Sequence, residues 1–339
     1  MGSARTRLAL LSLALLLLEH CSTVMMTNFT MRRKGPKQNP AVAVLATEII
    51  KAALACLLQT LLARNTLKCK AVFSISQIAL IAPPAAMYTA QNYLIYLALS
   101  HLELVTFQIL YQSKLLLTAI FSVAFLGHEI RCIQWIALFF LTVGVIIVEL
   151  SSVETDTNYV AAWREGNRLG QGTVLVAAAL SSAAGVYFEG VVKSPNGETY
   201  SLWMRNIHLC MSTIPLAALG VVFDRHRIVA AGGLLYGFDV FAVMVVLLNA
   251  SGGLIVATVI LYGDNMLKNF FTACSVVLGS VFSMVVFDFR PSVSFGVGAA
   301  FVMISTIVYS GSYFDRLSQS DEEAKHTDLA EEDPLIDEF

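Results

Sequence analysis

The stretch FQILYQSKLLL, residues 107–117, places one lysine, Lys114, inside a run of apolar residues. Apolar residues continue on both sides, in LIYLALS at 94–100 and LTAIFSVAFLG at 117–127. If this run crosses a bilayer, a charge near its middle costs about 2.5–3.5 kcal/mol on insertion scales. A lysine in that position is therefore a candidate functional residue, and the first question is whether the chain spans a membrane.

The composition of the 339-residue chain is that of a membrane protein. Hydrophobic residues make up 57% and charged residues only 14%, whereas soluble domains carry about 25% charged residues. The net charge of −2 creates no basic field, so nucleic acid is not expected as a partner. The chain is predicted to be polytopic, with the lipid bilayer as its solvent.

Apolar windows of about 20 residues, the length that crosses a bilayer, recur along the chain with short polar breaks. Because backbone groups in lipid must bond internally, these windows predict an all-α polytopic membrane protein. The first window could belong to a signal peptide, but it is long and no small-x-small site closes it, so a retained helix is favoured. The ten predicted helices cover residues 7–28, 40–63, 76–100, 104–126, 132–150, 170–192, 202–223, 238–262, 266–287 and 292–314.

The longest connector, 151–169, divides these helices into five and five. We expect a first five-helix repeat at 1–150 and a second at 170–314, with nearly constant offsets between corresponding helices. An odd number of spans in each half gives the halves opposite orientations, as in the inverted repeats of secondary transporters, whose site lies at the midplane. The acidic tail, 315–339, lacks apolar periodicity and is predicted to be disordered.

Polar residues inside the predicted spans fall on two faces. Phe107, Tyr111, Lys114 and Thr118 follow helical spacing and form one stripe. A second face, on the preceding helix, carries Tyr88, Gln91 and Asn92. A cation among aromatic rings and amides suits a nucleotide, since it offers an ammonium for phosphate, rings for base stacking and amides for base edges.

The second half offers a matching cation in YGDNMLKNFF, residues 262–271, where Asn265 and Lys268 lie three residues apart. Lys268 is in the fourth predicted helix of its half, as Lys114 is in the first half. An inverted repeat would bring both lysines to a central cavity, and two lysines there imply an anionic substrate. Two alternatives stay open: Lys268 could snorkel to the interface, and Lys114 could pair with a buried acid such as Glu48, unless Glu48 is satisfied by Lys51.

Further candidates lie in the second half. In GVYFEGVVK, Tyr187 is a secondary candidate. Lys193 and Arg205, near helix ends, are each expected to snorkel or to pair with Glu189. Asn206 lies deeper in its helix and is a pocket candidate. The adjacent glycines Gly252 and Gly253 allow either close helix packing or the approach of backbone to a ligand.

Known catalytic motifs are missing from the sequence, which shows no G-x-S-x-G, no H-E-x-x-H and no P-loop. An integral-membrane glycosyltransferase would need clustered carboxylates at a membrane face, and the few acids in the predicted spans are scattered. The protein is therefore not expected to be an enzyme.

Four motifs resemble one family. They are residues 88–127 (YTAQNYLIYLALSHLELVTFQILYQSKLLLTAIFSVAFLG), 184–193 (AGVYFEGVVK), 201–207 (SLWMRNI) and 262–271 (YGDNMLKNFF). They resemble the nucleotide-sugar transporters, in the branch that carries CMP-sialic acid, UDP-galactose and UDP-N-acetylglucosamine within the drug/metabolite transporter superfamily. The resemblance runs in register from about the second predicted helix to the tenth.

The resemblance implies an antiporter of the Golgi membrane that exchanges a nucleotide sugar for the nucleoside monophosphate. It implies ten helices in two inverted repeats, both termini in the cytosol, and neither metal nor cofactor. Endosomal or ER membranes are alternative locations, and a homo-oligomer is allowed. Carried over residue by residue, the resemblance places six side chains in the central cavity: Tyr88, Asn92, Tyr111, Lys114, Asn206 and Lys268. The secondary candidates are Gln91, Phe107, Tyr187, Gly252, Gly253 and Asn265.

The sequence departs from the family pattern at three positions. Phe107 stands where the family often has a tyrosine, Ser113 replaces a leucine, and Leu261 stands where a lysine is common. The missing cation favours a UDP-sugar, with galactose or N-acetylglucosamine, over CMP-sialic acid. A CMP-sialic acid transporter and a general metabolite exporter of the same superfamily remain alternatives.

The tail contains EEDPLI, residues 331–336, which fits an acidic dileucine sorting signal. If the signal is used, it implies a sorting adaptor as a partner of the tail.

Overall fold

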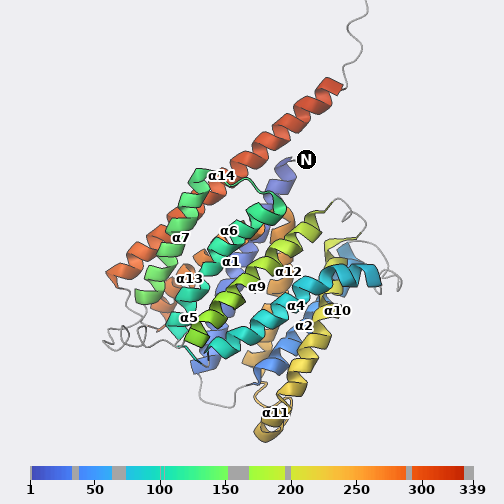
Figure 1. The fold of residues 1–339 in the computed structure, drawn as a ribbon, viewed down its shortest axis with the longest axis vertical. Helices are drawn as coiled ribbons and strands as arrows, with labels where there is room; N and C mark the ends of the chain where they lie inside the picture. The colour runs from blue at the N-terminus through green and yellow to red at the C-terminus, as the bar shows by residue number, and fades with distance from the viewer. Residues whose placement is uncertain are drawn as a thin grey trace, which may run out of the picture.

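The structure is a computed structural model that describes residues 2–32, 38–62, 74–99, 101–102, 104–151, 168–194, 200–287 and 292–331. Within these ranges every regular element is an α-helix (Figure 1). The helices are α1 (Gly2–Arg32), α2 (Pro40–Leu62), α4 (Ile75–Leu99), α5 (Leu104–Tyr111), α6 (Ser113–Leu126), α7 (Cys132–Ser151), α9 (Arg168–Lys193), α10 (Leu202–Phe223), α11 (Arg225–Ala231), α12 (Val240–Tyr262), α13 (Asn265–Phe287) and α14 (Val293–Glu331).

Each predicted apolar range overlaps one of these helices, or the α5–α6 pair. Among the described residues, seven helical segments are long and apolar enough to cross a membrane, and Cys132–Val148 in α7 is a shorter apolar helix. The protein is therefore a multi-pass membrane protein, as the composition predicted.

The helix predicted at 104–126 is divided at Gln112. The Gln112 N–H donates to the Ile109 carbonyl at 3.2 Å, and the Leu115 N–H donates to the Gln112 carbonyl at 2.9 Å. These i→i+3 bonds tighten the backbone locally, and such turns inside a helix often mark a hinge or a strained sequence. The apolar pattern could not reveal this break, because neither glycine nor proline stands there.

The expectation of a disordered tail differs from the structure over residues 315–331, which continue α14 as helix. This segment contains three Glu, two Ala and two Leu, which favour helix. Extending an existing helix also avoids the cost of nucleation. Most of the sorting pattern, residues 332–336, lies outside the described part of the chain.

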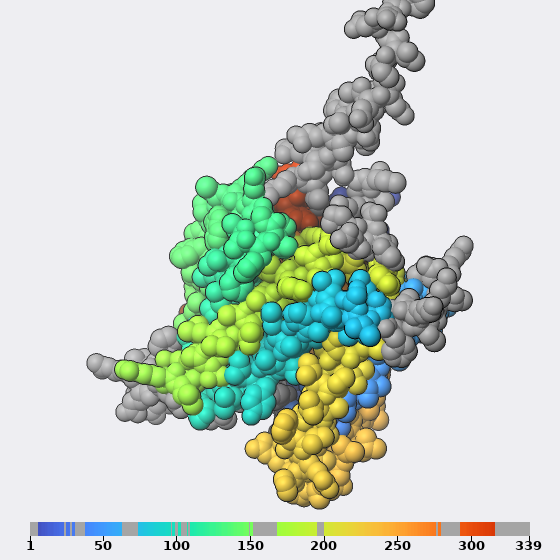
Figure 2. All heavy atoms as spheres, turned by 45° about the vertical axis from the view of Figure 1, so that its right-hand side comes forward, coloured from blue at the N-terminus to red at the C-terminus, as the bar shows by residue number. Residues whose placement is uncertain are grey.

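The helices pack in matched pairs when the chain is halved between α7 and α9. α4 packs on α9 as α12 packs on α1, α6 packs on α9 as α13 packs on α1, and α4 packs on α10 as α12 packs on α2. Two further pairs, α2 with α10 and α7 with α14, consist of corresponding helices of the two halves. Figure 1 shows α7 beside α14, and Figure 2 shows α4 next to α10 on the surface.

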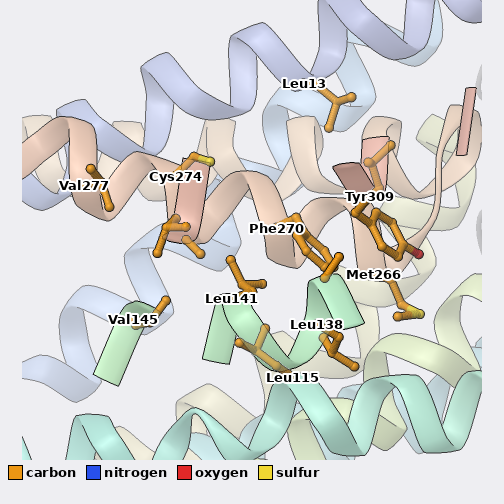
Figure 3. Packing of buried hydrophobic residues seen from close by; sticks show 14 of the residues in the cluster. Leu13, Leu115, Leu138, Leu141, Val145, Met266, Phe270, Cys274, Val277 and Tyr309 are labelled. Carbon is orange, nitrogen blue, oxygen red and sulfur yellow. The ribbon is translucent and has the colours of Figure 1, made fainter. Parts of the chain in front are cut away.

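The largest buried apolar cluster draws side chains from α1, α6, α7, α12, α13 and α14. Phe270 of α13 is fully buried and stacks on Tyr309 of α14, with ring centroids 4.1 Å apart (Figure 3). Leu115 and Leu267, the chain neighbours of Lys114 and Lys268, are both buried in this cluster. Burial of these two leucines fixes how α6 and α13 are rotated, and so which way the two lysines point.

The contact between α7 and α14 depends on two glycines. A Cβ atom on Gly298 would lie 2.8 Å from the Gly144 carbonyl oxygen and 2.9 Å from the Val148 nitrogen. A Cβ on Gly144 would lie 2.9 Å from the Gly298 carbonyl oxygen. Each glycine thus lets the backbone of the other helix approach, as is common between helices in membranes.

We predict that Gly298→Ala destabilises the protein by about 1–3 kcal/mol, because the new methyl group would meet backbone atoms that cannot move alone. The measurement is thermal unfolding of the purified protein in detergent. Gly296→Ala is the matched control on the same helix, since no atom lies within 4 Å of a Cβ there. Equal unfolding temperatures for the two variants would contradict the prediction.

Candidate functional site

Lys114 lies beside two stacked aromatic rings. Phe107 and Tyr111, one turn apart on α5, stack with centroids 5.3 Å apart and an interplanar angle of 16°. The Lys114 Nζ atom lies 5.1 Å from the centroid of the Tyr111 ring, which is cation–π geometry. Phe107, Tyr111 and Lys114 therefore remain on one face across the break at Gln112, as the helical spacing predicted.

Lys268 approaches Lys114 from the other half of the chain. Its Nζ atom donates to Asn265 Oδ1, one turn earlier on α13. The amide of Asn269, the residue after Lys268, donates to the hydroxyl of Thr118, one turn after Lys114, at 3.3 Å. The two lysines therefore lie on neighbouring helices beside this contact, where their like charges disfavour each other. The charge of Lys114 also acts on His20 of α1. Three nitrogen-bearing side chains, from α1, α6 and α13, thus converge in the interior.

A buried network of hydroxyl and amide groups joins α6, α9 and α13 next to the lysines. The Ser182 hydroxyl of α9 donates to the Lys114 carbonyl at 2.9 Å, and the Thr118 hydroxyl lies 2.7 Å from the same carbonyl. The Asn269 side-chain amide of α13 donates to Thr118 Oγ1 at 3.3 Å. This network ties α6, α9 and α13 together beside the lysines.

A second polar cluster lies where α9 meets the α12–α13 junction. Glu189 is fully buried and pairs with Lys193 at 2.7 Å, which confirms the salt bridge that was one of two expectations for Lys193. The Glu189 Oε2 atom also accepts the Asn265 backbone N–H at 3.1 Å. Arg205 points elsewhere and donates to the Val191 carbonyl.

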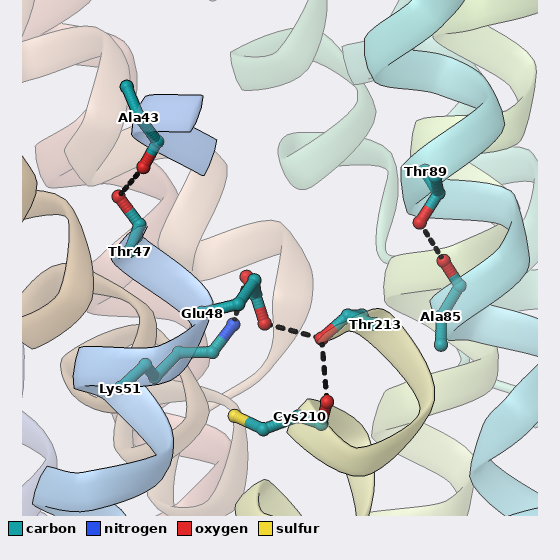
Figure 4. A network of polar contacts seen from close by, with 8 residues as sticks. All are labelled: Ala43, Thr47, Glu48, Lys51, Ala85, Thr89, Cys210 and Thr213. Carbon is teal, nitrogen blue, oxygen red and sulfur yellow. Dashed lines mark hydrogen bonds and ion pairs between the residues drawn. The ribbon is translucent and has the colours of Figure 1, made fainter. Parts of the chain in front are cut away.

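A third cluster joins α2 to α10 and α12. Glu48 pairs with Lys51 at 2.6 Å and accepts a hydrogen bond from the Thr213 hydroxyl (Figure 4). Glu48 therefore pairs with Lys51 in this structure, and not with Lys114. A Cβ on Gly253 would lie 2.9 Å from Lys51 Cδ, so this glycine makes room for the lysine stem.

Several predicted site residues lie apart from the two lysines. The Tyr187 hydroxyl is on an exposed side chain and donates to the Leu80 carbonyl at 3.1 Å. Asn206 is buried but donates to the Leu202 carbonyl of its own helix at 3.0 Å. Gly252 faces the Glu19 carboxylate of α1.

The three residues predicted to share one face of α4, Tyr88, Gln91 and Asn92, have different surroundings in the structure. Tyr88 lies near Tyr111. Gln91 is buried, and its amide donates to Asn92 Oδ1 at 3.4 Å, whereas the Asn92 side chain is exposed. The structure thus brings Tyr88, Phe107, Tyr111 and Lys114 together on one side, and Asn265 and Lys268 on the other.

The sequence reasoning missed Glu19 and His20 of α1 as members of the polar interior. Both stand in the apolar run LALLLLEHC, residues 13–21, and an ionisable pair inside a predicted span is a signal that could have identified them.

The fold and the polar interior define a multi-pass membrane protein, and comparisons with known proteins show which family it belongs to. A family profile described as "Nucleotide-sugar transporter" matches residues 4–310. The UDP-N-acetylglucosamine transporter of Canis lupus familiaris is 34% identical over 90% of this chain and 95% of its own length. The UDP-galactose translocator of the same species is 34% identical over 91% of this chain and 78% of its own.

Two other relatives are covered less fully. The UDP-galactose transporter of Schizosaccharomyces pombe is 36% identical over 68% of this chain. The match spans 64% of that relative's length, and a Caenorhabditis elegans relative is covered over 60% of its length. A solved crystal structure superposes with a TM-score of 0.66 at 15% identity, over 90% of this chain and 98% of that one, which shows that the fold is shared. The chain belongs to the nucleotide-sugar transporter family.

We predict that Lys51→Met alone destabilises the protein by about 3–5 kcal/mol, because it leaves the Glu48 carboxylate without its cation. The double variant Glu48→Gln, Lys51→Met removes both charges and keeps an acceptor for Thr213, so it should recover most of the loss. Thermal unfolding in detergent measures the stability of the single and the double variant. A double variant no more stable than the single one would show that the ion pair is not the cause.

Proposed function

We propose that this protein exchanges a nucleotide sugar for a nucleoside monophosphate across a membrane by alternating access. The observation that carries the proposal is that Lys114 and Lys268 come from different halves of the chain and flank the same contact, the hydrogen bond from the Asn269 amide to the Thr118 hydroxyl. Lys114 rests on an aromatic ring and Lys268 on an amide oxygen, and neither partner bears a negative charge. An anion between them would relieve their repulsion.

The groups around the lysines fit the other parts of a nucleotide. The Phe107–Tyr111 stack offers aromatic faces for a base, and Tyr88 lies nearby. Ammonium groups suit phosphate oxygens, because bonds between charged partners are stronger than neutral ones. Asn92 and Asn206 are proposed as amides that contact the substrate in another state of the transport cycle. Here the Asn206 amide is bound to the Leu202 carbonyl of its own helix and the Asn92 side chain is exposed, so their contact with the substrate is part of the proposal.

We further propose a UDP-sugar, with galactose or N-acetylglucosamine, as the substrate. The names of the relatives support this choice, since they specify UDP-galactose and UDP-N-acetylglucosamine. CMP-sialic acid is the alternative to be tested beside it.

Ten membrane spans in two inverted repeats are proposed as the architecture of exchange. The matched helix pairs support it, because exchanging the two halves turns the α4–α9 contact into the α12–α1 contact, and likewise for the other pairs. Such repeats place a site near the midplane, between the halves. The turn at Gln112, next to Lys114, is where α5 could tilt relative to α6.

The membrane is proposed to be that of the Golgi, with both termini in the cytosol. The family resemblance supports this location. With the tail in the cytosol, the EEDPLI pattern at 331–336 would be a binding motif for a sorting adaptor.

Reconstitution tests the proposed exchange. Liposomes preloaded with UMP or CMP should take up labelled UDP-galactose or UDP-N-acetylglucosamine faster than empty liposomes, and UMP should stimulate more than CMP. Labelled CMP-sialic acid is run in parallel. Stimulation by CMP alone would replace the UDP-sugar with CMP-sialic acid, and no stimulation by either nucleotide would overturn the exchange.

We predict that Lys114→Ala and Lys268→Ala each lower exchange at least tenfold, because each removes a charge-assisted bond worth about 1.5–3 kcal/mol. Initial uptake rates at equal amounts of folded protein give the measurement. Arg225→Ala, on the exposed surface of α11, is the control and should transport normally. Normal exchange by either lysine variant would remove that lysine from the site.

A further inference from the structure

We infer that Gly185 and Glu189 of α9 are positioning residues that hold the Lys268 ammonium in place through Asn265. The inference rests on the proposed function, because it gives the α9 face a part in binding the anionic group of the substrate. Neither residue needs to touch the substrate itself. Gly185, Glu189 and Lys193 are spaced four residues apart, so they lie on one face of α9.

Glu189 and Lys193 hold the start of α13 from two sides. The Glu189 Oε2 atom accepts the backbone N–H of Asn265, the first residue of α13, at 3.1 Å. The Oε1 atom is bound by Lys193, whose Nζ also donates to the Gly263 carbonyl at 2.5 Å. The α9 face thus holds the backbone on both sides of Asp264. Asp264 itself accepts the Leu267 N–H, and His128 of the α6–α7 loop lies 3.9 Å from Glu189 Oε1.

Gly185 leaves the space that the Asn265 side chain occupies. A Cβ atom at position 185 would lie 2.5 Å from Asn265 Nδ2 and 3.0 Å from its Oδ1 atom. Asn265 is almost fully buried, so its amide has little room to move aside. Its Oδ1 atom is the acceptor for Lys268 Nζ.

The contacts form one continuous path from α9 to the ammonium. Glu189 binds the Asn265 backbone, Gly185 leaves room for the Asn265 amide, and that amide accepts the hydrogen bond from Lys268. The Glu189 charge also acts favourably on Lys268. A shift of the Asn265 amide would therefore move the cation relative to Lys114 and to the phosphate that both are proposed to bind.

The test compares binding of a nucleotide with binding of the nucleoside that lacks the phosphate. The affinities of purified protein for UMP and uridine, and for CMP and cytidine, are measured by calorimetry. We expect Gly185→Ala to lower the preference for nucleotide over nucleoside by about tenfold and to leave nucleoside affinity unchanged. General loosening of the structure would instead weaken both ligands. Gly172→Ala is the matched control, the same change on α9 where no atom lies within 4 Å of a Cβ.

Each outcome has a defined meaning. A Gly185→Ala protein that keeps the wild-type preference for nucleotide overturns the positioning role and leaves the proposed function standing. A wild-type protein that shows no preference for nucleotide over nucleoside overturns the proposed function, and this inference with it. If Gly185→Ala does not fold, Glu189→Gln decides, since it keeps an acceptor for Asn265 but weakens the hold on α13. A wild-type preference in that variant likewise overturns the positioning role.

Discussion

The high cost of a charge away from water governs how this interior is arranged. Glu48 and Lys51 satisfy each other on one helix, as do Glu189 and Lys193 on another. Lys114 and Lys268 are different, because a ring and an amide are their partners and the two ammonium groups repel. Other features of the bundle follow from this contrast: apolar neighbours fix the rotation of α6 and α13, and hydroxyl groups tie the helices behind them.

The sequence allowed most helices to be located, for a physical reason. Lipid demands long apolar windows, and such windows can be read without knowing what packs on what. The break at Gln112 could not be read, since the i→i+3 bonds there depend on backbone geometry and no breaking residue marks them. The helical extension of α14 was not predicted from the composition of the tail. Composition alone leaves out that a segment that continues an existing helix does not pay the cost of helix nucleation.

The candidate site was predictable in part. Helical spacing placed Phe107, Tyr111 and Lys114 on one face, and they do lie together. The expectation that Lys268 comes near Lys114 agrees with the contact of the adjacent Asn269 with Thr118, and the two-repeat arrangement from which it was drawn stays a prediction. Spacing alone could not tell that Asn206 bonds back to its own helix, or that Tyr187 reaches the α4 backbone, because a side chain's partner depends on the neighbouring helix.

The two pairs of corresponding helices differ in how they would respond to water. Glu48 with Thr213 and Gln59 with Ser201 join α2 to α10, and these groups could exchange their partners for solvent at little cost if the two helices moved apart. α7 and α14 meet backbone to backbone at Gly144 and Gly298. Separation of α2 from α10 would therefore hydrate these polar groups, but it would also expose Ala55, Met204 and Ile207, which are buried in an apolar cluster between the two helices. Separation of α7 from α14 would instead break the close backbone approach at the two glycines.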